Sequence, residues 1–417
     1  MLGPWGSRLA GAAAAALAAA AGWAAPLPRL GGVTVQAWAV AVAEPDGRIL
    51  TRGEGAAELD SEGRPIRPFG PRTPLRVASI SKVVVALAVL RLADQGRLGL
   101  DDDVSLWLGW PLRHPYHPDR PIRVRHLLAH TAALSDAGGY VVPLGTDLRS
   151  YLSSASFSAH PPGEVFDYAN LGSVVLATVI ERVTGERFDR AAQRLVLKPL
   201  GIRACFNWSG CPAGFARRGA VLHRPSSHGG WTAEADAERP PAGCPVRLGP
   251  GTSCQDLERY VPGTNGGLFS PQGGLRISVA ELARLGRAVL VNQGRFLKTT
   301  THAALFGAQP ILAHGAGPET DRRLFRAWSE GGLHCLSGTG AADGDQPLSP
   351  RPTAGCGHLG DAYGVKAALV MDPKTGTVRA QAVLGSPEPP PQGRVSAFAA
   401  LEEALFALAP TAPPAER

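Results

Sequence analysis

A long stretch without glycine or proline opens with Leu75-Arg76-Val77-Ala78-Ser79-Ile80-Ser81-Lys82 and runs on to Gln95. From Val83 onward, apolar residues fall on nearly every helical face, which predicts a helix buried in the core even though consecutive valines are poor helix formers. Gly96 is a typical helix stop. We expect this helix to begin near Ser79, and the rest of the chain to be organised around it.

Ser79 and Lys82 are three residues apart and would share a face of this helix. A hydroxyl at a helix N-terminus lies at the positive end of the helix dipole. A buried lysine beside it can be kept neutral by desolvation and can then accept the hydroxyl proton. Ser-x-x-Lys is the arrangement found in one class of serine enzymes. The structural alternative is a serine that caps the helix beside a solvated lysine.

The composition is that of a globular protein. The chain has 417 residues, of which 44% are hydrophobic and 18% charged, with a net charge of +7. No basic run interleaved with aromatic residues occurs, so nucleic acid is not an expected partner. His126 and His130 have i,i+4 spacing on a probable helix, but Leu127 stands where a zinc protease motif has glutamate. We expect structural histidines, and neither a metal nor an organic cofactor.

The N-terminus has the pattern of an export signal. Arg8 precedes an alanine-rich apolar run from Leu9 to Ala21, and small residues at 22–24 predict cleavage before Ala25. An uncleaved anchor is the alternative, and no later segment is apolar enough to span a membrane. We therefore expect 1–24 to be a signal peptide and the mature protein to be periplasmic or extracellular.

All six cysteines follow residue 200, and they are close in sequence as three pairs: Cys205 with Cys211, Cys244 with Cys254, and Cys335 with Cys356. Cysteines of an exported chain favour disulfides. Six cysteines allow 15 pairings, so local pairing is a preference and the others remain open. No Cys-x-x-Cys or cysteine–histidine cluster with zinc spacing occurs.

Periodicity and turn residues predict strands at both chain ends and helices between them. The expected strands are 33–43, 48–55, 363–371 and 377–384, and 57–74 is expected to be a loop. The expected helices follow Asn170 as far as Gly185, cover 282–291 after a Ser278–Glu281 capping box, and cover 396–408. This order predicts an α+β fold, with an antiparallel sheet built from both chain ends and flanked by helices. The sheet part would be about 33–80 and 280–408, the helical part about 81–279, and the tail 409–417 disordered.

With these segments identified, the chain resembles the serine β-lactamase and penicillin-binding-protein superfamily. The resemblance is to the group of class C β-lactamases, D,D-carboxypeptidases, D-aminopeptidases and family VIII esterases, and it covers about 33–405. Ser79-Ile80-Ser81-Lys82 matches the first motif of the family, and Tyr168-Ala169-Asn170 matches the second. Two further segments, Arg125 to Thr131 and Gly266-Gly267-Leu268-Phe269-Ser270, resemble its helix segment and its Gly-Gly-Leu-x-Ser turn.

The third family motif, Lys-Thr-Gly or His-x-Gly, has two candidates. Lys374-Thr375-Gly376 is a literal match, but it follows Asp372-Pro373 and is expected at the far tip of a hairpin. His358-Leu359-Gly360 lies at the start of the first expected hairpin strand, where the motif belongs. We therefore assign the third motif to His358.

The resemblance implies a role for each matching residue. Ser79 would attack a carbonyl and become acylated, Lys82 would accept its proton, and Tyr168 would relay a proton to the leaving group and help to activate water. Asn170 would hold Lys82 and bind substrate. Backbone N–H groups of Ser79 and Asp361 would form the oxyanion hole.

The third motif bears on the choice of substrate. His358, with Gly360 beside it, would support Tyr168 or bind a substrate carboxylate. Because histidine is charged at neutral pH only if its pKa is raised, this site should depend less on a substrate carboxylate than one with lysine. Esters or neutral amides are therefore favoured over β-lactams.

The expected function is that of an exported serine hydrolase, either an esterase or a D-amino-acid peptidase or carboxypeptidase, with weak β-lactamase activity at most. Its partner would be a small-molecule or peptide substrate. The alternative is an inactive penicillin-binding-like protein that binds cell-wall peptides, although such a protein would be expected to lose some of these motif residues. A third alternative, a disulfide-stabilised adhesive domain, explains the cysteines but not the ordered motifs. Nothing in the pattern predicts an oligomeric state.

Overall fold

The computed structural model describes residues 26–212, 214–240, 243–337, 344–347 and 354–409. The expected signal peptide and all of the expected tail except residue 409 lie outside these ranges. In the described part of the chain, no helix is long and apolar enough to cross a membrane.

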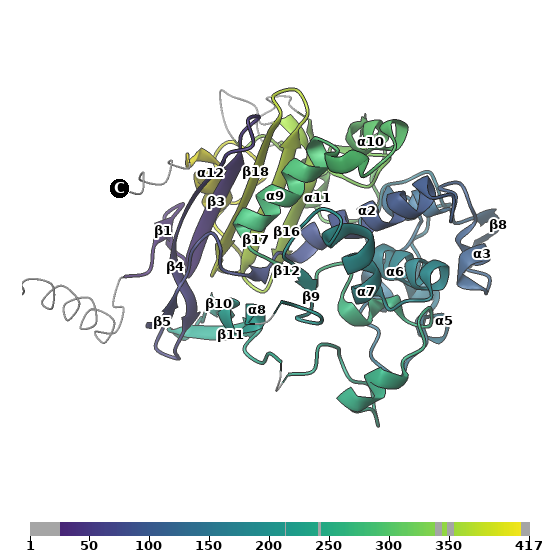
Figure 1. The fold of residues 1–417 in the computed structure, drawn as a ribbon, viewed down its shortest axis with the longest axis horizontal. Coiled ribbons are helices and arrows are strands. Elements are labelled where there is room, and N and C mark those ends of the chain that lie inside the picture. Colours follow the sequence, from purple (N-terminus) through teal and green to yellow (C-terminus); the bar gives the residue numbers. More distant parts are fainter. Residues whose placement is uncertain (1–25, 213, 241–242, 338–343, 348–353, 410–417) are drawn as a thin grey trace, which may run out of the picture.

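A nine-stranded antiparallel sheet forms one half of the molecule, in the order β13-β14-β15-β16-β17-β18-β3-β4-β5 (Figure 1). Strands from the two chain ends meet where β18 pairs with β3, with Val378 opposite Ala43 and Leu384 opposite Ala37. The sheet assembled from both chain ends is therefore confirmed. Its strands are β3 Ala37–Ala43, β4 Ile49–Leu59, β5 Pro65–Pro68, β13 Ala308–Pro310, β14 Ala327–Ser329, β15 His334–Ser337, β16 Ala354–Ala362, β17 Val365–Asp372 and β18 Thr377–Leu384.

Helices cover both faces of this sheet because its strands alternate their side chains between faces. Ala37, Ala39 and Ala41 of β3 belong to the main core, which includes the apolar face of α9 (Val279–Leu290). Trp38 points to the opposite face, where it packs in one cluster with Leu401 and Leu405 of α12 (Ala400–Ala407). Ser278 caps α9 by accepting a hydrogen bond from the Glu281 N–H at 3.2 Å, as its sequence predicts.

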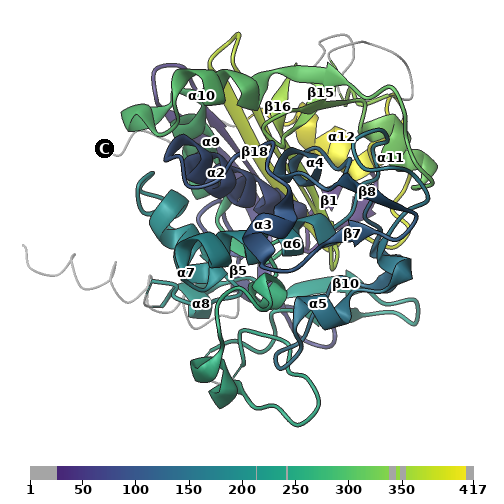
Figure 2. The same ribbon diagram turned by 90° about the vertical axis from the view of Figure 1, so that its right-hand side faces the viewer.

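The other half of the molecule is mainly helical and is built around α2 (Ser81–Asp94) and α6 (Leu171–Thr184). Seen from the helical side, α2, α3 and α6 lie in front of the sheet (Figure 2). All side chains of α2 from Ser81 to Leu90 are buried, as the uninterrupted apolar pattern predicts. The remaining helices are α3 Val104–Leu108, α4 Val124–Leu128, α5 Leu148–Tyr151, α7 Phe188–Ala192, α8 Phe215–Arg218, α10 Thr299–Phe306 and α11 Glu319–Leu324.

The central helix begins near Ser79, as expected: Ser79 lies in a 3₁₀ turn, Ala78–Ile80, and α2 follows directly from Ser81. The expectation of one helix carrying both His126 and His130 was wrong. α4 ends at Leu128, so His126 and His130 do not share a helix, and His130 adopts a left-handed conformation with φ 55°. Tyr363 is not in a strand but occupies the turn between β16 and β17 with φ 54°.

The structure also contains strands that the sequence did not predict. The expected loop 57–74 contains the end of β4 and the edge strand β5, and the short strand β6 (Leu75–Arg76) follows it. At the other edge of the sheet, β13, β14 and β15 add three further strands. Short strands also occur within 81–279: β7 Arg113–His114, β8 His117–Pro121, β9 Cys205–Phe206, β10 Leu222–Pro225, β11 Trp231–Ala235 and β12 Leu275–Ile277. Of these, β12 pairs with β6 and brings the segment after residue 270 beside Ser79.

The three local cysteine pairs are disulfides in the structure: Cys205–Cys211, Cys244–Cys254 and Cys335–Cys356. The third joins neighbouring strands of the main sheet, because Cys335 of β15 lies directly opposite Cys356 of β16. The other two close loops on the helical side, and the Cys244–Cys254 loop borders the cavity described below.

A buried carboxylate ties α6 to the loop after it. Glu181 is fully buried and accepts hydrogen bonds from the backbone N–H groups of Phe188 and Gly263, both at 2.8 Å, and from the Tyr260 hydroxyl. Three donors therefore depend on one side chain. Removing that side chain would leave two buried N–H groups unpaired, which is costly in a protein interior.

We predict that Glu181→Ala lowers the free energy of unfolding by about 3 kcal/mol, because it leaves these buried donors without an acceptor. Tyr260→Phe is the comparison variant: its hydroxyl donates to Glu181 and accepts from the Asn265 N–H at 3.0 Å, so its loss leaves one N–H group unpaired and should cost about half as much, about 1.5 kcal/mol. Urea titrations followed by circular dichroism would measure both. Equal losses in the two variants would show that the carboxylate is not the organising group.

Candidate active site

Ser79, Lys82 and Asn170 meet where the 3₁₀ turn, α2 and α6 converge. The Lys82 ammonium donates to Ser79 Oγ at 2.9 Å and to Asn170 Oδ1 at 2.7 Å. A third hydrogen bond, at 3.3 Å, goes to the backbone carbonyl of Gln272. Asn170 sits at the N-cap position of α6, but its side chain does not cap that helix. It is directed to Lys82 instead.

Lys82 is buried, and the loss of water around its amine lowers its pKa to about 7. The negative charge of Asp136 acts in the opposite direction and raises this pKa. An ordinary lysine would be almost fully protonated at neutral pH, whereas Lys82 is neutral in a large fraction of molecules. Lys82 is therefore able to accept a proton from the hydroxyl 2.9 Å away.

Asp136 is a site residue that sequence reasoning missed. Its carboxylate accepts hydrogen bonds from the Asn170 backbone N–H and Nδ2, both at 2.9 Å, and from the Leu171 N–H at 3.0 Å. It thus fixes Asn170 from behind and caps the start of α6. Asp136 lies in a short 3₁₀ turn, Asp136–Gly138, far from the recognisable motifs. Its role becomes visible only in the folded structure, where its carboxylate lies at the N-terminus of α6.

Tyr168 lies beside Lys82, whose Nζ is 4.8 Å from the centroid of the phenol ring. The ring stacks on Phe325 at 4.9 Å and packs against His130 at 4.5 Å, so aromatic groups surround it. Burial raises the pKa of the Tyr168 hydroxyl above its usual value, although a hydrogen bond with Ser79 opposes the effect. Tyr168 therefore keeps its proton at neutral pH, while Lys82 readily loses one.

His358 lies in the middle of β16, opposite Leu369 of β17, and is almost completely buried. Burial and the nearby Lys82 hold the pKa of its imidazole well below the usual value, so the ring is neutral. Its centroid is 6.1 Å from that of Tyr168 and 5.6 Å from that of Trp328. Such a buried, neutral ring can pack behind Tyr168 but is poorly suited to bind a substrate carboxylate.

The strand that carries His358 also brings Gly360 and Asp361 to Ser79. A Cβ on Gly360 would lie 2.3 Å from the Val77 carbonyl oxygen, so only glycine allows β16 to approach this closely. In the two-residue hairpin at Tyr363-Gly364, Ala362 and Val365 close the turn as a hydrogen-bonded pair. Hydrogen-bonded pairs alternate along antiparallel strands. The Asp361 N–H is consequently directed away from β17, toward the edge of β16 that faces the 3₁₀ turn.

Of two other motif candidates, Lys374 lies away from Ser79, whereas the Gly-Gly-Leu-x-Ser turn reaches the Ser79 cavity at Ser270. Lys374 is exposed in the turn between β17 and β18, at the opposite end of β17 from the Gly360–Ala367 pair. The Gly266–Phe269 segment forms a 3₁₀ turn against α6, where the Gly266 N–H donates to Thr178 Oγ1 at 3.0 Å. The residues that touch Lys82 from this region come slightly later, at Gln272.

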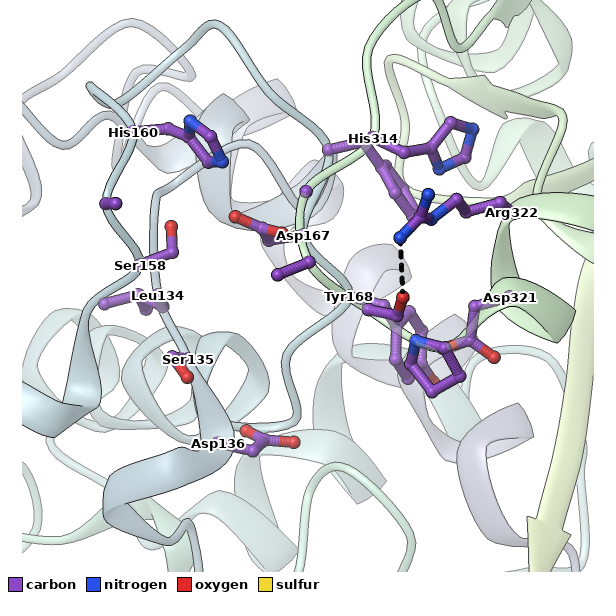
Figure 3. A pocket seen from close by; sticks show the side chains of 16 residues that line it. Leu134, Ser135, Asp136, Ser158, His160, Asp167, Tyr168, His314, Asp321 and Arg322 are labelled. Atoms are coloured by element: carbon purple, nitrogen blue, oxygen red, sulfur yellow. Dashed lines mark hydrogen bonds between the residues drawn. The ribbon is translucent and has the colours of Figure 1, made fainter.

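Two cavities lie on either side of the Tyr168–Asn170 segment. One, of about 400 Å³, is lined by Ser79 and Asn170 and extends to described residues of 236–240 and 244–247 and to the Tyr363 turn. The other, of about 320 Å³, is lined by Tyr168 and three carboxylates, Asp136, Asp167 and Asp321 (Figure 3). The hydrogen bond drawn there joins Arg322 to the carbonyl of Gly317 at 3.4 Å. The described residues contain no group of histidine, cysteine and acidic side chains able to hold a metal ion.

Comparisons with solved structures support the fold. D-amino acid amidase from Ochrobactrum anthropi SV3, complexed with D-phenylalanine, superimposes with a TM-score of 0.59 over 85% of this chain and 88% of that chain, at 18% identity. The octameric penicillin-binding protein homologue from Pyrococcus abyssi superimposes with a TM-score of 0.61 over 89% of this chain and 72% of that chain, at 19% identity. At such identities, the likeness concerns the fold.

Sequence comparisons identify curated relatives. Esterase EstB from Burkholderia gladioli is 38% identical over 199 residues, which are 43% of this chain and 49% of the relative. D-alanyl-D-alanine-carboxypeptidase/endopeptidase AmpH from Escherichia coli K12 is 27% identical over 170 residues, 36% of this chain and 44% of the relative. Each is thus matched over less than half of its own length. A family model described as Beta-lactamase matches residues 30–404, and we conclude that the chain belongs to the β-lactamase family.

Proposed function

We propose that this protein is an exported serine hydrolase that cleaves an ester or amide through an acyl-enzyme formed on Ser79. The observation that carries the proposal is the contact of 2.9 Å between Ser79 Oγ and Lys82 Nζ, an amine whose pKa burial lowers to about 7. A nucleophile needs a neutral base within hydrogen-bond reach, and Lys82 is such a base.

The proposed reaction begins when Ser79 Oγ attacks the substrate carbonyl carbon and Lys82 accepts the hydroxyl proton. The carbonyl oxygen becomes an oxyanion, which the N–H groups of Ser79 and Asp361 stabilise. Tyr168 then passes a proton to the leaving group, and Lys82 restores it, so that the bond to the leaving group breaks with no net change in charge. In the second half, water loses a proton to the same groups and attacks the acyl carbon; the bond between that carbon and Ser79 Oγ then breaks, and the proton passes to Oγ, which restores the hydroxyl.

The assignment of base and acid rests on opposite effects of burial. Desolvation lowers the pKa of an amine and raises that of a phenol, because it disfavours the charged form of each. Lys82 is therefore the proton acceptor and Tyr168 the proton donor. Asn170 holds the Lys82 amine in place, and Asp136 holds Asn170.

The leading substrates are esters and neutral amides, with D-amino-acid peptides next and β-lactams last. A neutral His358 gives the third motif no positive charge, so a leaving group without a carboxylate suits this part of the site. Relatives named as an esterase and as a carboxypeptidase/endopeptidase are consistent with this range. Export to the periplasm or outside the cell follows from the expected signal peptide and agrees with the three disulfides.

We predict that a fluorophosphonate probe labels Ser79 and that Ser79→Ala abolishes both labelling and turnover. Intact mass and peptide mapping of the purified protein would detect the adduct. Lys82→Met should slow labelling by about 10²- to 10⁴-fold, the usual contribution of a general base. Lys298→Met, which replaces an exposed lysine, is the control and should react normally.

No adduct in the folded protein would contradict the hydrolase proposal and favour a binding role on the same fold. An adduct on another serine would move the active site elsewhere.

The pH dependence of this labelling should report the pKa of Lys82, with the rate rising as the amine loses its proton. Asp136→Asn removes a negative charge that raises this pKa, so the midpoint of the rise should move to lower pH. Asp167→Asn is the control, since Asp167 lines the same cavity as Asp136 but is not among the charges that shift Lys82. A midpoint that moves upward, or moves equally in both variants, would refute the proposed coupling.

Tyr168→Phe should slow the cleavage of substrates with poor leaving groups much more than that of activated esters, because only the former require a proton from the enzyme. We expect kcat/KM to fall by about 10²-fold for an alkyl amide and less than about tenfold for a nitrophenyl ester. Steady-state rates with the two substrates would measure the difference. Equal losses would indicate that Tyr168 only shapes the site.

A further inference from the structure

The cavity onto which Ser79 opens contains a cluster of charged side chains that the proposed reaction does not use. Arg76, Asp236 and Arg276 all line this cavity of about 400 Å³. Their side chains are 15%, 5% and 2% exposed, so they form its inner wall and not its rim. We call these three residues the Arg–Asp–Arg cluster.

Arg276 is held firmly in the interior. Its Nη2 donates to Asp236 Oδ1 at 2.7 Å, and its Nη1 donates to the Gly274 carbonyl at 2.7 Å. Trp208 lies against its guanidinium, 5.2 Å from the ring centroid, and donates to the same Asp236 oxygen at 2.9 Å. The first oxygen of Asp236 is therefore fully occupied by Arg276 and Trp208.

Arg76 shares the same carboxylate only loosely. Its Nε is 3.8 Å from Asp236 Oδ2, which is beyond a hydrogen bond. Both Arg76 Nε and Asp236 Oδ2 are buried and have no hydrogen-bond partner among the described residues. Arg76 donates from Nη1 to the Gly273 carbonyl at 3.1 Å, and its guanidinium lies 4.9 Å from the ring of Tyr363. The guanidinium of Arg76 is thus oriented but incompletely satisfied.

The cluster holds two positive charges and one negative charge in a poorly solvated wall. An uncompensated buried charge is costly, and an anion from outside would lower that cost. Charged residues at the rim of the cavity do not supply this compensating anion. Asp361 pairs with Lys366 at 2.6 Å, and the exposed Glu238 and Arg247 carry opposite charges.

Gln272 is a second, independent feature of this cavity. Its side chain is only 8% exposed, and its Oε1 is buried without a hydrogen-bond partner. Its backbone carbonyl accepts from Lys82 at 3.3 Å, and the residue lines the same cavity as Ser79 and the cluster. Because the oxygen and nitrogen of an amide exchange places on rotation, Gln272 can also present an N–H donor to a ligand.

We propose that this cavity binds the acyl part of the substrate and that Arg76, assisted by Gln272, recognises a carboxylate at its far end. The inference rests on the proposed function and specifies its substrate class as monoesters or monoamides of dicarboxylic acids and other acyl groups with a terminal carboxylate. A guanidinium can donate two parallel hydrogen bonds to such a group. Acyl groups with a free ammonium would be repelled by the same cluster.

This carboxylate differs from the one considered for the third motif. His358 lies behind Tyr168 and does not line the Ser79 cavity, whereas Arg76 does. The chain therefore needs no cation at its third motif to select an anionic substrate. The selecting charge belongs to β6, three residues before the nucleophile.

Three ethyl esters of matched length test the proposal: monoethyl glutarate, the ethyl ester of its monoamide, and ethyl 5-aminopentanoate. We expect kcat/KM of the wild-type protein to be highest for the carboxylate and lowest for the ammonium. Arg76→Gln should lower the carboxylate-to-amide ratio by about 10- to 100-fold, as expected for the loss of a charged hydrogen bond. A purely structural role for Arg76 would lower both rates together, and either that result or the absence of a wild-type preference would overturn the proposal. Arg259→Gln, at a side chain that is 88% exposed, is the control and should keep the ratio.

A measurement on the wild-type protein covers the case in which Arg76→Gln does not fold. Glutarate should slow fluorophosphonate labelling of Ser79 competitively, glutaramide should not, and added salt should weaken the effect of glutarate. Equal protection by both compounds, or by neither, would refute anion recognition. In all these tests, labelling of Ser79 and turnover of the neutral ester report on the hydrolase proposal. If Ser79 is labelled and the neutral ester is hydrolysed, but the ester with a terminal carboxylate reacts no faster, only the present inference fails.

Discussion

The site depends on the burial of one amine. Lys82 lies on a helix whose neighbouring side chains are all buried, so water cannot stabilise its charge, and its pKa falls to about 7. The groups around it are arranged for this purpose: three hydrogen bonds fix its position, while the Asp136 carboxylate prevents its pKa from falling further. An apolar helix interior and the contact between Lys82 and Ser79 are thus two consequences of the same run of residues, 75–95.

The sequence predicted what is local and periodic. The buried helix that carries Lys82, the α6 helix between Asn170 and Gly185, and the turn at Lys374 all depend on neighbouring residues. The edge strands β13, β14 and β15 were missed because each has only three or four residues, too few to establish an alternating pattern. Asp136 was missed for a different reason: its three hydrogen bonds are to residues 34 and 35 positions away, in a segment with no motif of its own.

The third motif shows how strand register decides chemistry. Successive residues of β16 alternate between its two faces and its two edges. His358 is therefore buried, whereas the Asp361 N–H, three residues later, reaches the edge that faces Ser79. The structure has Lys374 in the hairpin turn expected for it, but the role of His358 depends on its environment, which the sequence does not give. In the structure, the inner wall of the serine cavity carries its positive charge on Arg76 and Arg276.

The joining of β18 to β3 has a consequence for when the site can exist. Ser79 and Lys82 are made early, but the strand that carries Asp361 and the β18 strand beside β3 come from the last sixth of the chain. Contacts between such distant segments form late and slowly, since a long loop must close first. A partly folded chain in which β16 to β18 have not yet joined β3 therefore has Ser79, Lys82 and Tyr168 without the Asp361 N–H and without the centre of its sheet. The complete cavity exists only after these distant segments have paired, so its assembly is tied to the closure of the longest loop in the sheet.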